Sequence, residues 1–504
     1  MRRYGWISLL VFLFALVAPS PAEDSAGMLA RILANKGVIG ASELVMVQAA
    51  DPEKRVQLLA SILEEKGVLS RAEVAKLMRL PETSDSTVAA QLRPAVYTPD
   101  AAPQAPSAAQ PTPQPSATPA PPVTAQSRFP VVIYGTILTN AFYNTVLTNI
   151  TDTPLFTVQR GADAFGNEKN IGVTARQSRF GMRYQGPRVA GAQISGQFEF
   201  DLFGGKAPFT NGINFDLFRL RLAFGRLDWE NISLVVGQDW SVFAPLNPTT
   251  FAEYAIPGLS ASGNPWIRVP QIRADFRHAF SDRTRGQLQI GMVDPDVGDY
   301  STAVFSATRT PGVGERGGLP GAQARLGLTT KVDDRNFDIG LSATYARGKN
   351  VGTVGTTNFQ NGVDSWGVAL DYSLPILNKF NLTGEAYVGR ALGIFSVDSG
   401  ESVLPFGTVG ARGVNSRGGW MQAQFNLNPI WQINLAYGID APDFSQLPPG
   451  NRTKNQSYVG NVMYKFSPNV TFAWEYRRVL TNFRDRPAAN NKDDIVNLAI
   501  AYIF

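Results

Sequence analysis

The sequence contains no cysteine and a single histidine, His278. Without cysteine there is no disulfide framework and no thiolate metal ligand, so packing and hydrogen bonding must hold the fold. One histidine cannot form a metal-binding cluster, and no nucleophile stands beside a recognisable base. We therefore expect no metal, no cofactor and no enzymatic activity, with a mechanism based on carboxylates alone as the remaining enzymatic alternative.

Long apolar runs are also missing beyond residue 22, where no stretch approaches the roughly 18 apolar residues of a membrane-spanning helix. The one apolar core, Trp6 to Ala18, follows the basic residues Arg2 and Arg3. It ends before Ser20-Pro21-Ala22, which has the small-x-small pattern of a cleavage site. We predict a signal peptide over residues 1–22; a membrane anchor is the alternative.

Charge is in modest excess, with 46 Lys and Arg against 41 Asp and Glu, a net charge of +5 and a pI of about 9.2. The basic residues are scattered singly rather than gathered on a helix or in a run, so no nucleic-acid partner is expected. Lysine is scarce, because 34 of the 46 basic residues are arginine.

Residues 23–93 have a helical pattern with an internal repeat. The segment Ile32 to Ile39 recurs 30 residues later as Ile62 to Leu69, and each copy ends its helix near a glycine, Gly37 or Gly67. A further helix is expected to begin at Pro52. So small a region buries little surface alone, which favours self-association, for example as a trimer stalk. A loosely ordered spacer is the equal alternative, and periplasmic or cell-wall contact a third.

Residues 94–128 consist largely of Ala, Pro, Gln, Ser and Thr. Such a segment cannot offset the entropy of ordering by burying apolar surface. It predicts a semi-extended linker between the helical region and the rest of the chain.

From residue 129 to 504 the hydrophobic period becomes two, as where Phe198 and Phe200 alternate with Glu199 and Asp201. Sixteen strands are predicted, starting near residues 131, 176, 191, 215, 231, 267, 285, 323, 337, 364, 380, 419, 430, 457, 470 and 494.

Short and long connections alternate between these strands. Short turns are expected near Gly186-Pro187, Asp228, Ser281, Asp333, Leu377, Asn428 and Ser467, and long loops at 145–175, 204–214, 241–266, 295–322, 348–363, 391–417, 441–456 and 480–493. A soluble sandwich has no reason to sort its loops in this way. The pattern predicts an all-β fold, a transmembrane antiparallel β-barrel with periplasmic turns and extracellular loops.

The chain ends on an alternating apolar strand whose one face carries Val496, Leu498, Ile500, Tyr502 and Phe504. This ending resembles the C-terminal assembly signal of outer-membrane β-barrel proteins. Lipid would wet this face, and the neighbouring strand of a closed barrel would pair its edge.

A barrel of sixteen strands leaves an aqueous channel, so the inward side chains determine function. These positions are rich in arginine: Arg179, Arg183, Arg219, Arg221, Arg273, Arg277, Arg325 and Arg477. Arginine keeps its charge and matches carboxylates with two hydrogen bonds, and a ring of arginines lowers the barrier for anions. The alternative is that these arginines only pair with neighbouring acids and fix the loops.

The third long loop, 241–266, is rich in aromatic residues and proline and contains one acid, Glu253. We expect it to fold inward and narrow the channel. The alternative is an external loop that packs on a neighbouring subunit.

Three motifs resemble trimeric Gram-negative outer-membrane porins, the last two in particular the DcaP-type dicarboxylate channels: Tyr134-Gly135, Ser178-Arg179-Phe180-Gly181 and Gly237-Gln238-Asp239-Trp240-Ser241-Val242-Phe243. The resemblance implies a homotrimer with an N-terminal periplasmic helical extension and an arginine-lined constriction. The residues expected to form the constriction and bind solute are Arg179, Arg183, Arg219, Arg221 and Arg273, with Glu253 opposing them.

The sequence thus predicts a porin of the cell outer membrane for passive diffusion of small hydrophilic, anionic, dicarboxylate-like solutes. Its expected partners are outer-membrane lipid, two further copies of the chain and the solutes themselves. A closed structural barrel, adhesin-like or anchoring the envelope, is the alternative function.

Overall fold

The computed structural model describes residues 30, 41–65, 129–159, 166–206, 216–295, 297, 311–333, 335–354, 357–397, 403–405, 411–485 and 491–504. The predicted signal peptide and linker, and most of the helical repeat, lie outside the described residues. Contacts divide the chain into two units, Met1–Pro121 and Pro122–Phe504, and the division falls inside the predicted linker. The domain boundaries at residues 22, 93 and 128 stay predictions.

In the first unit, α3 (Ala41–Ala49) and α4 (Pro52–Glu65) form a pair of helices. Proline begins α4, as predicted, because the first helical position needs no backbone N–H. Arg55 of α4 donates hydrogen bonds to the carbonyls of Gln48 and Ala50 at the end of α3, at 2.8 and 2.9 Å. Among the described residues, neither helix is long and apolar enough to cross a bilayer.

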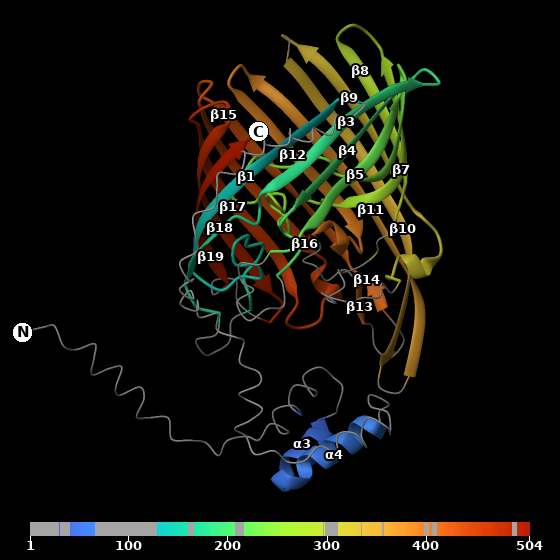
Figure 1. Cartoon of the computed structure of the whole chain (residues 1–504), viewed down its shortest axis with the longest axis vertical. Coiled ribbons are helices and arrows are strands. Elements are labelled where there is room, and N and C mark those ends of the chain that lie inside the picture. The colour runs from blue at the N-terminus through green and yellow to red at the C-terminus, as the bar shows by residue number, and fades with distance from the viewer. Residues whose placement is uncertain are drawn as a thin grey trace, which may run out of the picture. The chain divides into compact units, whose positions relative to one another are not determined.

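The second unit is a closed antiparallel barrel (Figure 1). β1 (Val131–Asn144) pairs with β19 (Lys492–Ile503), which closes the sheet. β2 (Asn170–Thr174) and β3 (Arg179–Val189) both pair with β1, so the seventeen strands of the sheet occupy sixteen wall positions. The predicted strand number is therefore confirmed.

The other wall strands follow in chain order, each antiparallel to the one before. They are β4 (Ala192–Asp201), β5 (Arg219–Asp228), β6 (Ile232–Trp240), β7 (Arg268–Ala279), β8 (Thr284–Val293), β9 (Gly321–Val332), β10 (Arg335–Val354), β11 (Thr357–Leu377), β12 (Phe380–Arg390), β15 (Asn415–Asn426), β16 (Trp431–Pro442), β17 (Arg452–Lys465) and β18 (Val470–Phe483). β13 (Val403–Pro405) and β14 (Ala411–Gly413) form a separate small hairpin.

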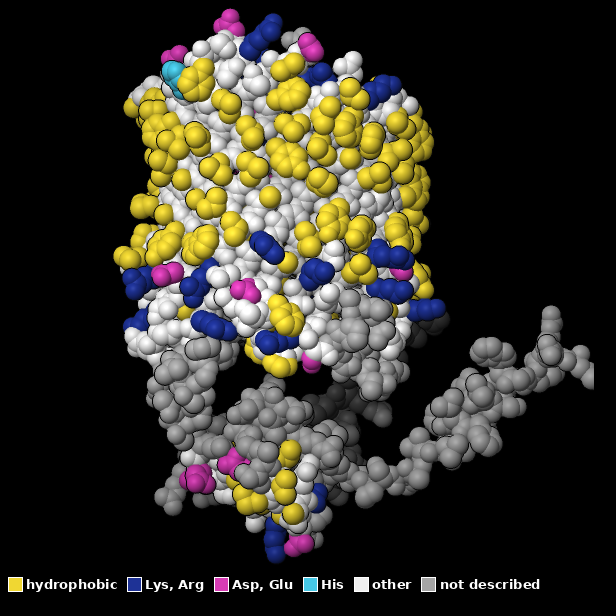
Figure 2. Space-filling model, turned by 180° about the vertical axis from the view of Figure 1, so that it is seen from behind, with side chains coloured by type: hydrophobic (Ala, Val, Ile, Leu, Met, Phe, Trp, Pro, Cys, Tyr) yellow, Lys and Arg dark blue, Asp and Glu magenta, His cyan; other side chains and the backbone are white. Residues whose placement is uncertain are grey.

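Alternation along each strand separates a lipid-facing surface from a polar interior. On β10, Ile339 and Leu341 are exposed on the outer surface, whereas Ser342 on the opposite face is buried. Figure 2 shows the result, a belt of hydrophobic side chains with almost no charge inside it. This is the outer surface of a transmembrane barrel, because lipid satisfies apolar side chains but not charged ones.

The C-terminal residue completes the closure. Phe504 and Gly135 exchange backbone hydrogen bonds of 2.9 and 3.1 Å, and the Phe504 ring covers Gly135. A Cβ atom at position 135 would lie 2.6 Å from that ring, so only glycine fits. The terminal aromatic residue therefore seals the seam between the first and last strands.

Three predicted connections were wrong, one of them the loop 145–175, whose last part forms the strand β2 paired with β1. Gly186-Pro187 lies inside β3, where a bulge between Gln185 and Arg188 absorbs the proline, and the turn instead lies at Ala190-Gly191, both with positive φ. The predicted loop 348–363 is mostly strand, because β10 and β11 continue pairing as far as Val354 and Thr357. The described parts of the other loops contain the short 3₁₀ helices Glu315–Gly317, Gly393–Phe395 and Phe444–Gln446.

Candidate functional site

The segment that joins β6 to β7, residues 241–267, folds into the barrel, as predicted. At its start, Ser241 Oγ donates to the side chain of Gln323 on β9 at 2.9 Å, and Ala244 N donates to Ser342 Oγ on β10 at 3.1 Å. Phe243 is fully buried and packs edge-on against Phe395. We call this segment the inner loop. The external alternative is wrong, because the groups it contacts lie on the inward face of the wall.

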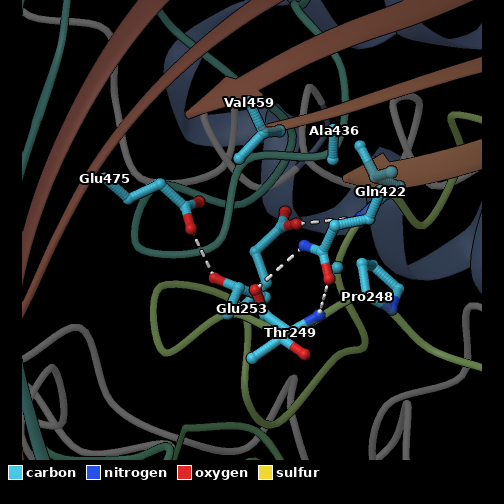
Figure 3. A pocket seen from close by; sticks show the side chains of 10 residues that line it. Pro248, Thr249, Glu253, Gln422, Ala436, Val459 and Glu475 are labelled. Atoms are coloured by element: carbon cyan, nitrogen blue, oxygen red, sulfur yellow. Dashed lines mark hydrogen bonds between the residues drawn. The ribbon is translucent and has the colours of Figure 1, made fainter. Parts of the chain in front are cut away.

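The middle of the inner loop contacts acids and amides on the far side of the barrel. Leu246 N donates to Glu385 at 2.6 Å, Thr249 N to Gln422 at 2.9 Å, and Thr250 Oγ1 to Glu475 at 2.5 Å. Figure 3 shows the last two contacts around a cavity of about 10 Å³ between loop and wall. A space of this size holds about one water molecule, so the loop lies almost directly on this wall.

Glu253 does not oppose the predicted arginines. Its carboxylate forms a buried ion pair with Arg477 of β18 and also accepts a 3.1 Å hydrogen bond from Leu259 N. The loop turns back at this point, so the side chain of its only acid points towards the β17–β18 side. The expectation that Glu253 lies opposite the arginines of β3–β7 is therefore corrected: it fixes the loop to the wall instead.

Three predicted arginines do come together, on β3 and β5. Arg219 contacts both carboxylate oxygens of Asp201, at 2.6 and 3.0 Å. Arg221 reaches Glu199 at 2.6 Å and Asp201 at 2.9 Å, and Arg179 lies 3.6 Å from Glu199. A fourth pair, Arg176 and Asp152, also belongs to this group. We call the group the arginine wall: Arg176, Arg179, Arg219 and Arg221 with the carboxylates of Asp152, Glu199 and Asp201.

The arginine wall also binds the inner loop. Arg179 donates to the carbonyl of Tyr254 at 2.8 Å, and its guanidinium lies 4.0 Å from the centre of the Tyr254 ring. Arg219 and Arg221 both donate to the carbonyl of Ala255, at 2.7 and 3.2 Å. These contacts are the ones that the alternative interpretation predicted, in which the arginines pair with neighbouring acids and fix the loop. Attraction of anions by the same arginines stays a prediction.

A β-bulge places both β5 arginines on this side. The register pairs Asp201 with Arg219 and Phe200 with Leu220, but Glu199 pairs with Leu222, so Arg221 has no partner across the strands. The additional residue of a bulge re-aims its side chain. Arg221 consequently lies beside both carboxylates, with only 1% of its side chain exposed.

Arg273 and Arg183 do not join this group. Arg273 pairs with Asp275 at 2.8 Å and Asp239 at 3.2 Å, on β7 and β6. Arg183 is exposed on β3 and lies 4.3 Å from the centre of the Tyr134 ring. Four strand residues, about 13 Å, separate it from Arg179 towards the short-turn end. Neither residue contacts the inner loop.

Sequence reasoning missed two residues of the site. Arg176, placed at the edge of a predicted loop, binds both oxygens of Asp152 and lies 3.8 Å from the centre of the Phe203 ring. Gln177 accepts hydrogen bonds from Tyr254 N and Ala255 N, at 2.8 and 3.0 Å, and donates to Ala252 O at 2.9 Å. An isolated glutamine gives no sequence signal for such a role. Its place between β2 and β3, outside the regular strand pairing, leaves its side chain able to bind the loop.

Comparison with solved structures finds outer-membrane channels of the same fold. The outer membrane channel DcaP of Acinetobacter baumannii matches with a TM-score of 0.56 and 18% identity over 75% of this chain and 99% of that chain. Outer-membrane expressed OmpT of Vibrio cholerae matches at 0.46 and 10%, and an anion-selective porin from Comamonas acidovorans at 0.45 and 13%, each over 75% of this chain and 99% or 100% of the other.

No family model and no curated protein sequence matches the chain. At 18% identity the likeness to the DcaP channel shows the fold alone, a closed transmembrane barrel of the porin type. Function must therefore be argued from the residues inside the barrel.

Proposed function

We propose that this protein is a porin of the outer membrane, of the DcaP type, through which small hydrophilic anions such as dicarboxylates diffuse passively. The observation that carries the proposal is the inner loop, held inside a barrel of sixteen wall positions directly beside the arginine wall. Barrels of this size are wide enough for an aqueous channel, and an inward loop narrows it to a selective passage.

The charge balance of the arginine wall supports anion preference. Four arginines, Arg176, Arg179, Arg219 and Arg221, face three carboxylates, Asp152, Glu199 and Asp201, so one net positive charge remains. Exposure differs within the group: 19% of the Arg179 side chain and 24% of the Arg219 side chain are exposed, against 1% for Arg221. Arg179 and Arg219 are thus the groups that can meet a solute, and Arg221 holds the loop.

The same proposal includes a homotrimer and an N-terminal region in the periplasm. Val47, Leu59, Ile62 and Leu63 form the small core between α3 and α4, yet Val45, Met46 and Val56 stay exposed on these helices. Three exposed apolar side chains on so small a unit favour self-association or contact with another envelope component.

The experiment is reversal potential across a planar bilayer containing the purified protein, in a KCl gradient. We expect an open channel with anion preference whose current is reduced by added succinate. A cation-preferring channel would retain the porin and overturn the anionic solute. Folded protein without conductance would contradict the porin and leave a closed structural barrel.

A further inference from the structure

The hydrophobic belt ends, on the side of the long loops, in a row of aromatic and then basic side chains. On β10, exposed Tyr345 is followed two residues later by exposed Arg347. The strand registers place Trp366 opposite Tyr345, and Arg390 opposite Trp366. Figure 2 shows basic side chains gathered just below the belt, on the side of the long loops.

Arg417 on β15 extends the row, since it is paired with Val388, two residues before Arg390 on the same outer face of β12. Arg347, Trp366, Arg390 and Arg417 therefore lie on the four adjacent strands β10, β11, β12 and β15, one residue on each. We call these four residues the rim patch.

The rim patch has surplus positive charge. Among the described residues, the acid that pairs with the patch is Asp364, which lies 3.9 Å from Arg347 and accepts a hydrogen bond from Tyr345 OH at 3.1 Å. Within the part of the chain that the structure describes, Arg390 and Arg417 form no ion pair, and the Arg390 Nε atom is buried without a hydrogen-bond partner. Counted over these described residues, three arginines against one aspartate leave two net positive charges.

The surface next to the rim patch is apolar. Val368, Leu370, Val388 and Met421 are all exposed on the outer face of the same strands. An occupant that satisfies both parts must combine phosphate or another anion with hydrocarbon chains. Arginine binds phosphate through two parallel hydrogen bonds, aromatic rings favour the boundary between hydrocarbon and headgroup, and basic residues there attract anionic lipid.

We propose that the rim patch binds the phosphate groups of a phosphorylated lipid of the outer leaflet, whose acyl chains lie along β11 to β15. A second copy of this chain fits less well, because it would bring its own arginines against these. The proposal is independent of the solute that crosses the barrel, so conductance and lipid binding can fail separately.

The test is native mass spectrometry of the full chain in detergent, titrated with diphosphoryl lipid A. Arg390→Gln together with Arg417→Gln should weaken binding by at least about tenfold, since each basic residue near such a surface contributes roughly a fivefold factor. Asp364→Asn should tighten binding. Arg417→Gln alone, at an exposed side chain, should show an intermediate loss and serves if the double variant does not fold.

The matched control is Arg283→Gln with Arg285→Gln, two exposed basic residues at the opposite end of the barrel with the same change of charge. It should bind lipid A as the wild type does. Equal binding by the Arg390→Gln/Arg417→Gln protein would overturn the proposal. So would displacement of the lipid by inorganic phosphate, or a dimer that the double variant abolishes.

Discussion

The two sides of the barrel hold the inner loop with opposite chemistry. On β3 and β5, arginine side chains donate to loop carbonyls, whereas on β12 and β18 the carboxylates of Glu385 and Glu475 accept from the loop. Their exposure differs as well. Both of these acids are buried, but Arg179 and Arg219 keep part of their side chains open. We therefore interpret the acidic side as structural and propose that the basic side acts on a solute.

The largest expected effect comes from removing Arg477 of β18, a cation on the otherwise acidic side, where it pairs with the loop acid Glu253. Arg477→Met leaves the buried carboxylate of Glu253 without its partner, and loss of one member of a buried ion pair costs about 3–5 kcal/mol. We expect the inner loop to detach, with higher and noisier single-channel conductance and lower stability to urea. Glu253→Gln combined with Arg477→Met removes both charges and should recover part of the loss. A variant with wild-type conductance and stability would show that this pair does not hold the loop.

A smaller loss is expected at Gln177, which anchors the loop beside the arginine wall. Gln177→Ala removes two accepted hydrogen bonds and two donated ones, to Ala252 O and to Asn140 Oδ1, each contributing about 1 kcal/mol, so the free energy of unfolding should fall by about 3–4 kcal/mol. Urea denaturation measures this. The matched control is Gln432→Ala, whose side chain donates only to Asn434 of the same strand and should cost less than half as much. Equal losses in the two variants would count against the anchoring role.

The smallest effect is expected at Glu475 on the buried acidic side. Its Oε2 atom accepts hydrogen bonds from Thr250 Oγ1 and Asn461 Nδ2, at 2.5 and 3.1 Å, and a glutamine retains an oxygen there. Glu475→Gln should change neither ion selectivity nor conductance. A shift of reversal potential in this variant would mean that the acidic side meets the solution after all.

Much of the barrel could be predicted because each strand obeys a local rule. Alternation fixes which face meets lipid, and a final aromatic residue such as Phe504 marks the closing strand. The inward course of the inner loop also followed from its composition. The partners of single side chains could not be predicted in this way. Glu253 pairs with Arg477, 224 residues later, and only the course of the loop in three dimensions determines that contact.

Local irregularities account for the other differences. The bulge at Arg221 and the one that keeps Pro187 inside β3 shift the register by one residue, which no strict alternation anticipates. The hairpin of β10 and β11 is longer than predicted because its polar residues still pair through backbone hydrogen bonds, which carry no side-chain pattern.

The proposed difference between the basic and the acidic side of the barrel is tested most directly by the reversal potential of the Arg179→Gln/Arg219→Gln protein in a KCl gradient. These substitutions leave Arg176 and Arg221 against three carboxylates, so the net charge of the arginine wall falls from +1 to −1, with Arg268 as a further cation close by. We predict a clear shift towards cations, while Arg183→Gln, an exposed arginine away from the loop, shifts the potential little. A double variant with the wild-type reversal potential would contradict the assignment of selectivity to the arginine wall.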